Sequence, residues 1–359
     1  SMTIAVTGRC NLRCQYCFYA DEMVALKDLS TEQWLAFFEE LGRIAVQRVT
    51  LTGGEVFTRP DLFELIDGIV ANKMRYGLLT NGTLIDEEVL AQFAVGKRRL
   101  RLDSIQVSID GSCAEVHDKS RPKSFARAVR GLRLLKEAGY PVTVRTTINH
   151  HNLHDLDNIA HFLLDEIGLP TFSTNEAIPM GAGCENQGQI TLNAAGKLAA
   201  MDTLARLRER YNGRLVAQAG PQANLDMYAE MEHARQTGEK TTRWQMGYLT
   251  ACGCIFSKLD VLHDGTLVPC HMLYDLHLGH ITTDSVAEIW HTHPTLQALR
   301  ERRAIPMQQV PGCEGCGWAA FCNGSCPGLA YTLRGELNQA NPEDCYRRFL
   351  RETRPSHAL

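Results

Sequence analysis

The 359-residue sequence lacks the features that mark membrane proteins, secreted proteins and nucleic-acid-binding proteins. It contains no apolar run long enough to span a bilayer, and no secretory signal pattern. Neither sign of charge dominates: 37 Lys and Arg residues stand against 41 Asp and Glu residues, for a net charge of −4. This balance predicts neither a nucleic-acid partner nor an anionic membrane partner. We therefore expect a cytoplasmic protein.

Cysteine, in contrast, is abundant, with 13 residues in the chain. Stable disulfides are uncommon in a reducing cytosol, so this number indicates metal ligation or catalysis. Three cysteines lie near the N-terminus, two are isolated (Cys113 and Cys184), and eight follow residue 250. We expect the two isolated cysteines to be buried structural thiols.

Between the cysteine groups, strand-like and helix-like segments alternate. Helix-like segments such as 31–45 and 124–139 separate six β-branched, apolar runs, at 3–8, 48–54, 75–82, 103–111, 142–149 and 171–178. This alternation predicts βαβ units and a parallel sheet. Six strands are too few for a closed eight-stranded barrel, which leaves an open partial barrel or a doubly wound sheet. Both architectures bind ligands at the carboxyl ends of their strands.

Four short stretches fall at such strand ends: CNLRCQYC (10–17), GGE (53–55), TNG (80–82) and SIDG (108–111). Three thiolates leave one iron of a four-iron cubane without a protein ligand, and that iron is open to a substrate or cofactor. Simpler interpretations exist for each stretch. The thiols could belong to a zinc site completed by a distant histidine, and the other three stretches could be turns. Their order at successive strand ends favours one shared ligand site.

The CxxxCxxC loop after a first strand, followed by GGE and SIDG, resembles the radical S-adenosylmethionine (SAM) superfamily. The resemblance implies a 4Fe–4S cluster on Cys10, Cys14 and Cys17. It also implies cofactor contacts, namely Tyr16 near the adenine, Gly53, Gly54 and Glu55 at the methionine amino group, and Ser108 and Asp110 as polar contacts. Glycines permit close backbone approach, and a carboxylate complements an ammonium group. Arg121 and Arg145 are candidate partners for the cofactor carboxylate, and an ordinary salt bridge explains either arginine at least as well.

The second half carries a CxxC-x5-C-x3-C pattern followed by a lone cysteine: Cys313, Cys316, Cys322, Cys326 and Cys345. Upstream lie Cys252, Cys254 and Cys270. This arrangement resembles the SPASM extension of peptide-modifying radical SAM enzymes, which implies two auxiliary 4Fe–4S clusters. The first would use Cys270, Cys326 and one or both of Cys252 and Cys254. The second would use Cys313, Cys316, Cys322 and Cys345, with a zinc site as the alternative.

The expected organisation is a partial (β/α)6 TIM-like barrel over residues 1–215, a linker with bridging helices over 216–250, and a SPASM domain over 251–359. The resemblance implies SAM and three 4Fe–4S clusters as cofactors. Hydrogen abstraction by a 5′-deoxyadenosyl radical would then modify a peptide or protein, giving a cross-link, thioether, epimer or oxidised residue. The alternatives are a small-molecule substrate such as a tetrapyrrole side chain, and a non-catalytic iron–sulfur or zinc scaffold.

The same resemblance implies an electron donor such as flavodoxin or ferredoxin. The sequence starts directly at its first strand, so recognition of a leader peptide would need a separate protein, a removed segment or a different surface. His271, beside Cys270, is a candidate proton acceptor because its unperturbed pKa is near 6.5. The alternative is a histidine that only makes a hydrogen bond beside the cluster.

Overall fold

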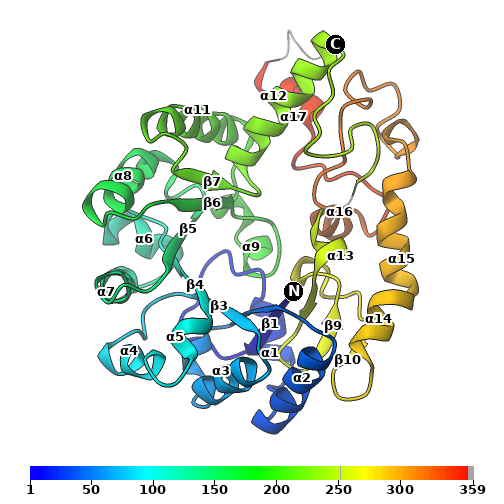
Figure 1. Ribbon diagram of the computed structural model, residues 1–359. Coiled ribbons are helices and arrows are strands. Elements are labelled where there is room, and N and C mark those ends of the chain that lie inside the picture. The colour runs from blue at the N-terminus through cyan, green and yellow to red at the C-terminus, as the bar shows by residue number, and fades with distance from the viewer. Residues whose placement is uncertain (251, 355–359) are drawn as a thin grey trace. The chain divides into compact units, whose positions relative to one another are not determined.

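The computed structural model describes residues 1–250 and 252–354, and the chain forms two compact units (Figure 1). Unit 1 comprises Ser1–Gln222 together with Val261–Gly265. Unit 2 comprises Ala223–Asp260 and Thr266–Leu359. The segment expected to be a linker with bridging helices, 216–250, contains the long helix α12 (Pro221–Thr237). The division between the units falls within the first turn of this helix.

In its described part, unit 1 contains seven parallel strands: β1 (Met2–Thr7), β2 (Arg48–Gly53), β3 (Arg75–Thr80), β4 (Leu102–Ser108), β5 (Val142–Ile148), β6 (Phe172–Glu176) and β7 (Leu215–Ala217). Each strand pairs with the next strand of the chain, in the order β1 to β7. In a barrel, each new strand of the chain is added to the same edge of the sheet, whereas in a doubly wound sheet the strand order reverses at one point. The partial barrel is therefore confirmed.

The six predicted strands correspond to β1–β6, and the sequence analysis missed the three-residue β7. The register places Ile4, Leu51, Leu78 and Ile105 in one row across β1–β4. All four side chains are fully buried, as expected for strands covered on both faces. Because these strands are parallel and adjacent, the segments that follow their carboxyl ends meet at one edge of the sheet.

The helices of unit 1 are α1 (Ala20–Ala25), α2 (Thr31–Arg43), η1 (Val56–Thr58), α3 (Leu62–Ala71), α4 (Glu87–Phe93), α5 (Arg98–Arg101), α6 (Ala114–Ser120), α7 (Phe125–Glu137), η2 (Leu153–Asp155), α8 (Leu156–His161), η3 (Phe162–Glu166), α9 (Ala182–Glu185), α10 (Gln187–Ile190) and α11 (Ala194–Arg210). Among them, α3, α4, α7, α8 and α11 lie outside the curved sheet in Figure 1. The predicted start of α2 is confirmed. The Ser30 hydroxyl accepts from the Gln33 amide, and the Gln33 side chain accepts from the Ser30 amide, which forms a capping box.

After α12, the elements of unit 2 are short: α13 (Cys254–Ser257), β8 (Leu259–Val261, whose last residue belongs to unit 1), β9 (Thr266–Val268), η4 (His271–Leu273), β10 (Gly279–His280), α14 (Val286–Thr292), α15 (Pro294–Glu301), η5 (Arg302–Ala304), η6 (Met307–Gln309), α16 (Pro327–Arg334) and α17 (Tyr346–Thr353). β9 and β10 form an antiparallel pair. One small core contains Leu249, Met307, Val310 and Ala319, and another contains Ile255, Leu273 and Leu299. Cores of this size are typical of regions whose folding is coupled to metal binding.

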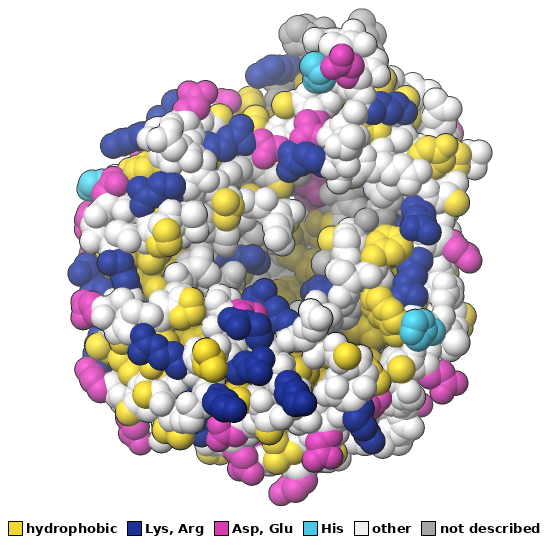
Figure 2. All heavy atoms as spheres, in the orientation of Figure 1, with side chains coloured by type: hydrophobic (Ala, Val, Ile, Leu, Met, Phe, Trp, Pro, Cys, Tyr) yellow, Lys and Arg dark blue, Asp and Glu magenta, His cyan; other side chains and the backbone are white. Residues whose placement is uncertain are grey.

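Charged side chains of both signs are scattered over the face of the molecule seen in Figure 2, in keeping with the nearly balanced charge of the sequence. Within residues 1–250 and 252–354, no helix combines the length and the apolar character needed to cross a membrane.

Candidate functional site

The three N-terminal cysteines lie in the loop that follows β1. The Cys10 Sγ accepts from the Leu12 amide at 3.4 Å, and the Cys17 amide donates to the Cys14 carbonyl at 3.2 Å. Burial raises the pKa of the Cys10 and Cys14 thiols and raises the pKa of Cys17 to about 11. At neutral pH these thiols are therefore protonated unless a metal displaces the protons. A partly buried, closely spaced set of three thiols fits ligation of an iron–sulfur cluster.

Hydrogen bonds from two neighbouring loops hold this cysteine loop in place. The Asn11 Nδ2 donates to the Thr83 Oγ1 at 2.8 Å, and the Asn81 Nδ2 donates to the Asn11 Oδ1 at 2.9 Å. On the other side, the Gln15 amide donates to the Ser120 carbonyl at 3.0 Å. The TNG stretch after β3 thus positions the cysteine loop.

Gly53 and Gly54 allow the end of β2 to approach the start of the cysteine loop. A Cβ on Gly53, whose φ is +138°, would lie 2.3 Å from the Thr7 carbonyl oxygen, and one on Gly54 would lie 2.1 Å from the Arg9 carbonyl oxygen. The Gly54 amide also donates to the Thr7 carbonyl at 2.8 Å. Any side chain at either position would therefore collide with the backbone of Thr7 or Arg9, which leads directly into Cys10.

Glu55 is 1% exposed, and its carboxylate joins the ends of β2 and β3. It accepts from the Thr80 Oγ1 at 2.7 Å, from the Asn81 amide at 2.7 Å and from the Phe57 amide at 3.3 Å. Burial raises the pKa of Glu55, although these hydrogen bonds act in the opposite direction. A carboxylate offers about four acceptor positions, so Glu55 retains capacity for one further donor such as an ammonium group.

Asp110, which is fully buried, organises the loop after β4. Its Oδ2 accepts from the Tyr16 hydroxyl and, at 2.5 Å, from the Arg121 Nε, while its Oδ1 accepts from the Thr147 amide at 2.7 Å. The Arg121 guanidinium also lies 5.2 Å from the Tyr16 ring centroid, and its Nη1 lies 3.7 Å from the Cys14 Sγ. Asp110, Tyr16 and Arg121 therefore form one network that ends at a cysteine of the β1 loop.

Ser108 and Arg145 are direct neighbours across β4 and β5. The Arg145 Nε donates to the Ser173 Oγ at 3.4 Å, and Arg145 forms no ion pair with any residue that the structure describes. Burial lowers its pKa. Of the two candidate arginines, Arg121 is already paired with Asp110, so Arg145 is the better candidate for binding a carboxylate.

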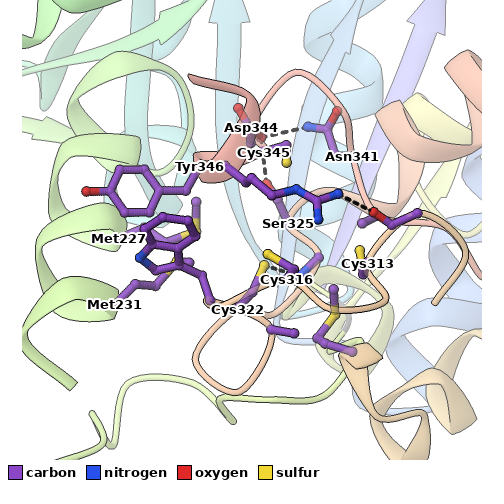
Figure 3. Close-up of a pocket in the computed structure, with 17 residues that line it drawn as sticks. Met227, Met231, Cys313, Cys316, Cys322, Ser325, Asn341, Asp344, Cys345 and Tyr346 are labelled. Carbon is purple, nitrogen blue, oxygen red and sulfur yellow. Dashed lines mark hydrogen bonds between the residues drawn. The ribbon is translucent and has the colours of Figure 1, made fainter. Parts of the chain in front are cut away.

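In unit 2, a pocket is lined by four predicted ligands, Cys313, Cys316, Cys322 and Cys345 (Figure 3). Burial raises the pKa of Cys313 to about 11 and that of Cys322 to about 12. Met227 and Met231 of α12 line the same pocket. A pocket lined by four partly buried thiols fits the complete ligand set of one cluster.

The residue before Cys345 anchors this cysteine. The Asp344 carboxylate accepts from the Ser325 Oγ at 2.5 Å, from the Asn341 Nδ2 at 2.7 Å and from the Asn224 Nδ2 at 2.9 Å. Sequence reasoning missed Asp344, as it missed Asn11 and Thr83 in unit 1. Asp344 is next to a predicted ligand and Asn11 lies between two of them, which is the signal that could have identified both.

Cys270 and Cys326 occupy equivalent positions at the starts of two helices. The Cys270 Sγ accepts from the Met272 amide and the Cys326 Sγ from the Leu329 amide, each at 3.5 Å. The two helices pack closely, because a Cβ on Gly328 of α16 would lie 2.5 Å from the Met272 Cβ.

The remaining candidate ligands of this group are Cys252 and Cys254. Burial and then the nearby Cys252 raise the pKa of Cys326 to about 11. Cys254 begins α13, but its side chain lies outside the described part of the structure. Whether both cysteines belong to one ligand set therefore stays open.

His271 follows Cys270 and pairs with a buried carboxylate. The Asp260 Oδ2 accepts from the His271 amide at 2.9 Å and lies 2.8 Å from the His271 Nδ1. Burial alone would raise the pKa of Asp260, but His271 and Lys258 hold it at about 2. Asp260 thus fixes the orientation of the His271 ring.

The expectation for the two isolated cysteines is wrong. Cys184 is exposed in the short helix α9, and Cys113 is only partly buried before α6.

Residues 1–250 and 252–354 contain no group of three or more His, Cys, Asp or Glu side chains placed to hold a single metal ion. A cubane has its ligands on separate irons, so it needs thiols that stand farther apart than the ligands of one zinc ion.

Comparison with known families agrees with both halves of the site. A sequence model of the radical SAM superfamily matches residues 4–163, and a model of the iron–sulfur cluster-binding SPASM domain matches residues 252–317. The chain therefore carries a radical SAM domain and a SPASM domain. It is therefore a radical SAM enzyme, with SAM, a 4Fe–4S cluster and auxiliary iron–sulfur clusters as its cofactors.

Three curated relatives match almost the whole chain. The AdoMet-dependent heme synthase of Methanosarcina barkeri is 28% identical, over 95% of each chain. Mycofactocin maturase MftC of Mycobacterium ulcerans is 29% identical, over 95% of this chain and 86% of its own. PqqA peptide cyclase of Granulibacter bethesdensis is 26% identical, over 94% of this chain and 84% of its own.

Among solved structures, anSMEcpe with bound AdoMet is 18% identical with a TM-score of 0.71, over 99% of this chain and 97% of that chain. SuiB of Streptococcus suis bound to the precursor peptide SuiA is 14% identical with a TM-score of 0.71, over 96% of this chain and 75% of that chain. At these identities the likeness concerns the fold, which is the partial barrel described above.

Proposed function

We propose that this enzyme modifies a peptide or protein side chain, with one radical SAM cluster and two auxiliary 4Fe–4S clusters. When bound and reduced, the first cluster with SAM supplies a 5′-deoxyadenosyl radical for hydrogen abstraction. The proposal depends most on one observation: the three-thiol loop after β1 and the four-thiol pocket of unit 2 occur in a single chain. Its full-length similarity to PqqA peptide cyclase favours a peptide substrate.

In this proposal, Cys10, Cys14 and Cys17 hold the radical SAM cluster. Glu55 accepts the methionine ammonium at its remaining position, and Arg145 with Ser108 binds the carboxylate. Tyr16, fixed by its hydrogen bond to Asp110, borders the adenine. Asp110 and Arg121 position the loop and Tyr16, and Gly53 and Gly54 bring Glu55 next to the cysteine loop.

The auxiliary clusters are held by cysteines that follow residue 250. Cys313, Cys316, Cys322 and Cys345 hold one cluster in the pocket of Figure 3. The other cluster is held by Cys270 and Cys326, together with Cys252, Cys254 or both. When bound, these clusters would supply an acceptor for the electron left on the substrate after hydrogen abstraction, and a small redox protein such as flavodoxin or ferredoxin would supply the reducing electron. A separate protein is our candidate for recognising any leader peptide.

His271 is our candidate acceptor for the proton that the substrate loses. Asp260 fixes the ring through Nδ1 and stabilises the imidazolium that forms, in the way that a carboxylate orients a histidine base elsewhere. Replacement of His271 by alanine should abolish product while cleavage of SAM continues. A normal product yield would exclude His271 as an essential base.

A second candidate function is modification of a tetrapyrrole side chain. It is favoured by the similarity to the heme synthase of Methanosarcina barkeri, which covers 95% of both chains. The two candidates share the radical chemistry and differ only in the substrate.

The test uses the full chain, reconstituted anaerobically with iron and sulfide and reduced with dithionite. Incubation with SAM should release 5′-deoxyadenosine, and a short peptide encoded beside the gene should change mass in the same reaction. Conversion of a tetrapyrrole, with no change in the peptide, would favour the second candidate. If a fully loaded, reduced protein released no 5′-deoxyadenosine, both candidates would be wrong.

A further inference from the structure

Arg302 is a fully buried cation without a buried anion beside it. The residue begins η5, directly after α15, and is 0% exposed. Its Nη2 donates to the Gln339 carbonyl at 3.2 Å, whereas its Nε and Nη1 are buried without a hydrogen-bond partner among the described residues. No carboxylate in the described part of the chain forms an ion pair with it.

A buried guanidinium in this state is unfavourable, since burial of a charge is tolerated when the charge is paired and hydrogen-bonded. Burial lowers the pKa of Arg302 to about 10, and Cys326 is the group that opposes this shift. At neutral pH Arg302 therefore keeps its positive charge. Among the described residues, it lacks a paired anion and acceptors for two of its three nitrogens.

The packing of unit 2 places Arg302 beside the predicted ligands of the first auxiliary cluster. One hydrophobic cluster joins Ile255 of α13, Leu273 of η4 and Leu299 of α15, and Tyr331 of α16 packs against it. The chain enters α13 at Cys254, enters η4 at Cys270, enters α16 at Cys326 and leaves α15 at Arg302. The three elements that begin at a predicted ligand are thus packed with α15, which ends at Arg302.

We propose that Arg302 is the buried counter-cation of the auxiliary cluster at Cys270 and Cys326, and that it raises the reduction potential of this cluster. This inference rests on the proposed cluster assignment. Thiolate ligands and bridging sulfides make a cubane anionic, and its sulfurs accept hydrogen bonds from a guanidinium. Reduction adds one electron from the donor, and a nearby positive charge favours that more negative state. Arg302 therefore makes this cluster a better acceptor for an electron from the substrate.

The experiment compares Arg302→Met with Arg303→Met in the reconstituted full-length enzyme. Arg303 is the next residue of the same 3₁₀ helix, but it is exposed, so its replacement removes an equal charge without uncovering the buried site. Redox titrations followed by electron paramagnetic resonance should separate the clusters by their midpoints. In Arg302→Met, we expect one midpoint to fall by about 59 mV, which is a tenfold change in a one-electron equilibrium. That component should be the one disturbed in Cys326→Ala.

The controls separate this inference from the cluster assignment. About eight irons in the wild-type protein, with the same count in Cys326→Ala, would mean that the cluster at Cys270 and Cys326 does not form. With twelve irons present, identical midpoints in Arg302→Met and Arg303→Met would overturn the role of Arg302. If Arg302→Met does not retain this cluster, Arg302→Lys decides. Retention of iron and of a near-wild-type midpoint by the lysine variant supports a counter-cation, and loss equal to that of methionine refutes it.

Discussion

His117 should make the stability of unit 1 depend on pH. The side chain is fully buried in α6, where its Nδ1 accepts from the Asp110 amide at 3.1 Å and its Nε2 lies 2.9 Å from the Ser124 Oγ. The Ser124 hydroxyl donates to the Arg121 carbonyl, so the histidine is neutral and donates from Nε2. Burial lowers its pKa from 6.5 to about 4.

The magnitude follows from the two pKa values. Between pH 6.5 and about 4, the unfolded chain binds a proton at His117 that the folded chain does not bind. Stability therefore rises with pH in this window and is lost as the pH falls. The loss relative to neutral pH is about 1.3 kcal/mol at pH 5.5 and about 3 kcal/mol at pH 4.

Urea unfolding under anaerobic conditions at pH 7.5 and at pH 5.5 tests this value. His117→Gln keeps an acceptor and a donor but cannot titrate in this range. Between the two pH values, the wild-type protein should lose about 1.3 kcal/mol more than the variant, and the difference cancels acid effects shared by both proteins. His154→Gln controls for loss of an exposed imidazole. Equal losses in the wild type and in His117→Gln would refute the reasoning.

Three further predictions concern the clusters and SAM. Simultaneous replacement of Cys10, Cys14 and Cys17 by alanine should reduce the bound iron from about twelve to about eight atoms, measured by iron analysis, and a loss of all iron would contradict independent sites. Glu55→Ala should weaken SAM binding by roughly 1.5–3 kcal/mol in calorimetry with no change in iron, since the carboxylate binds the ammonium and not the metal. Unchanged affinity would mean that GGE only forms a turn. Gly328→Ala should lower the iron content by about four atoms, because its Cβ would lie 2.5 Å from the Met272 Cβ and separate the helices that begin at Cys270 and Cys326. Full iron in a folded Gly328→Ala protein would show that this close approach is not needed.

The partial barrel could be predicted from sequence because its signals are local. The β-branched runs that become β1–β6 each alternate with a helix, and motifs such as GGE directly follow their strands. β7, in contrast, has only three residues, Leu215–Ala217, and pairs with β6 through tertiary structure. A segment this short carries too little periodicity to be recognised.

The chemistry of the individual polar side chains could not be read in the same way. Asp110 and Arg121 were both expected to face the cofactor, and the structure pairs them with each other at 2.5 Å. Their sequence separation of eleven residues gives no indication of an ion pair, because the β4–α6 connection folds back on itself. The roles of Asp110 and Arg121 toward SAM therefore stay predictions.

The two units differ in whether the arginine beside their cysteines has a carboxylate partner, and this difference bears on how the enzyme assembles. In unit 1, Arg121 has the Asp110 carboxylate as its partner, so the positive charge beside Cys14 is balanced when no metal is bound. In unit 2, Arg302 lacks such a carboxylate among the described residues, and Cys326 has a pKa of about 11, so its thiol is protonated when no metal is bound. An iron–sulfur cluster would supply the missing negative charge and the missing acceptors in a single step. The SPASM unit should therefore gain more stability from cluster assembly than the barrel does, and its folding should be the step that depends on iron.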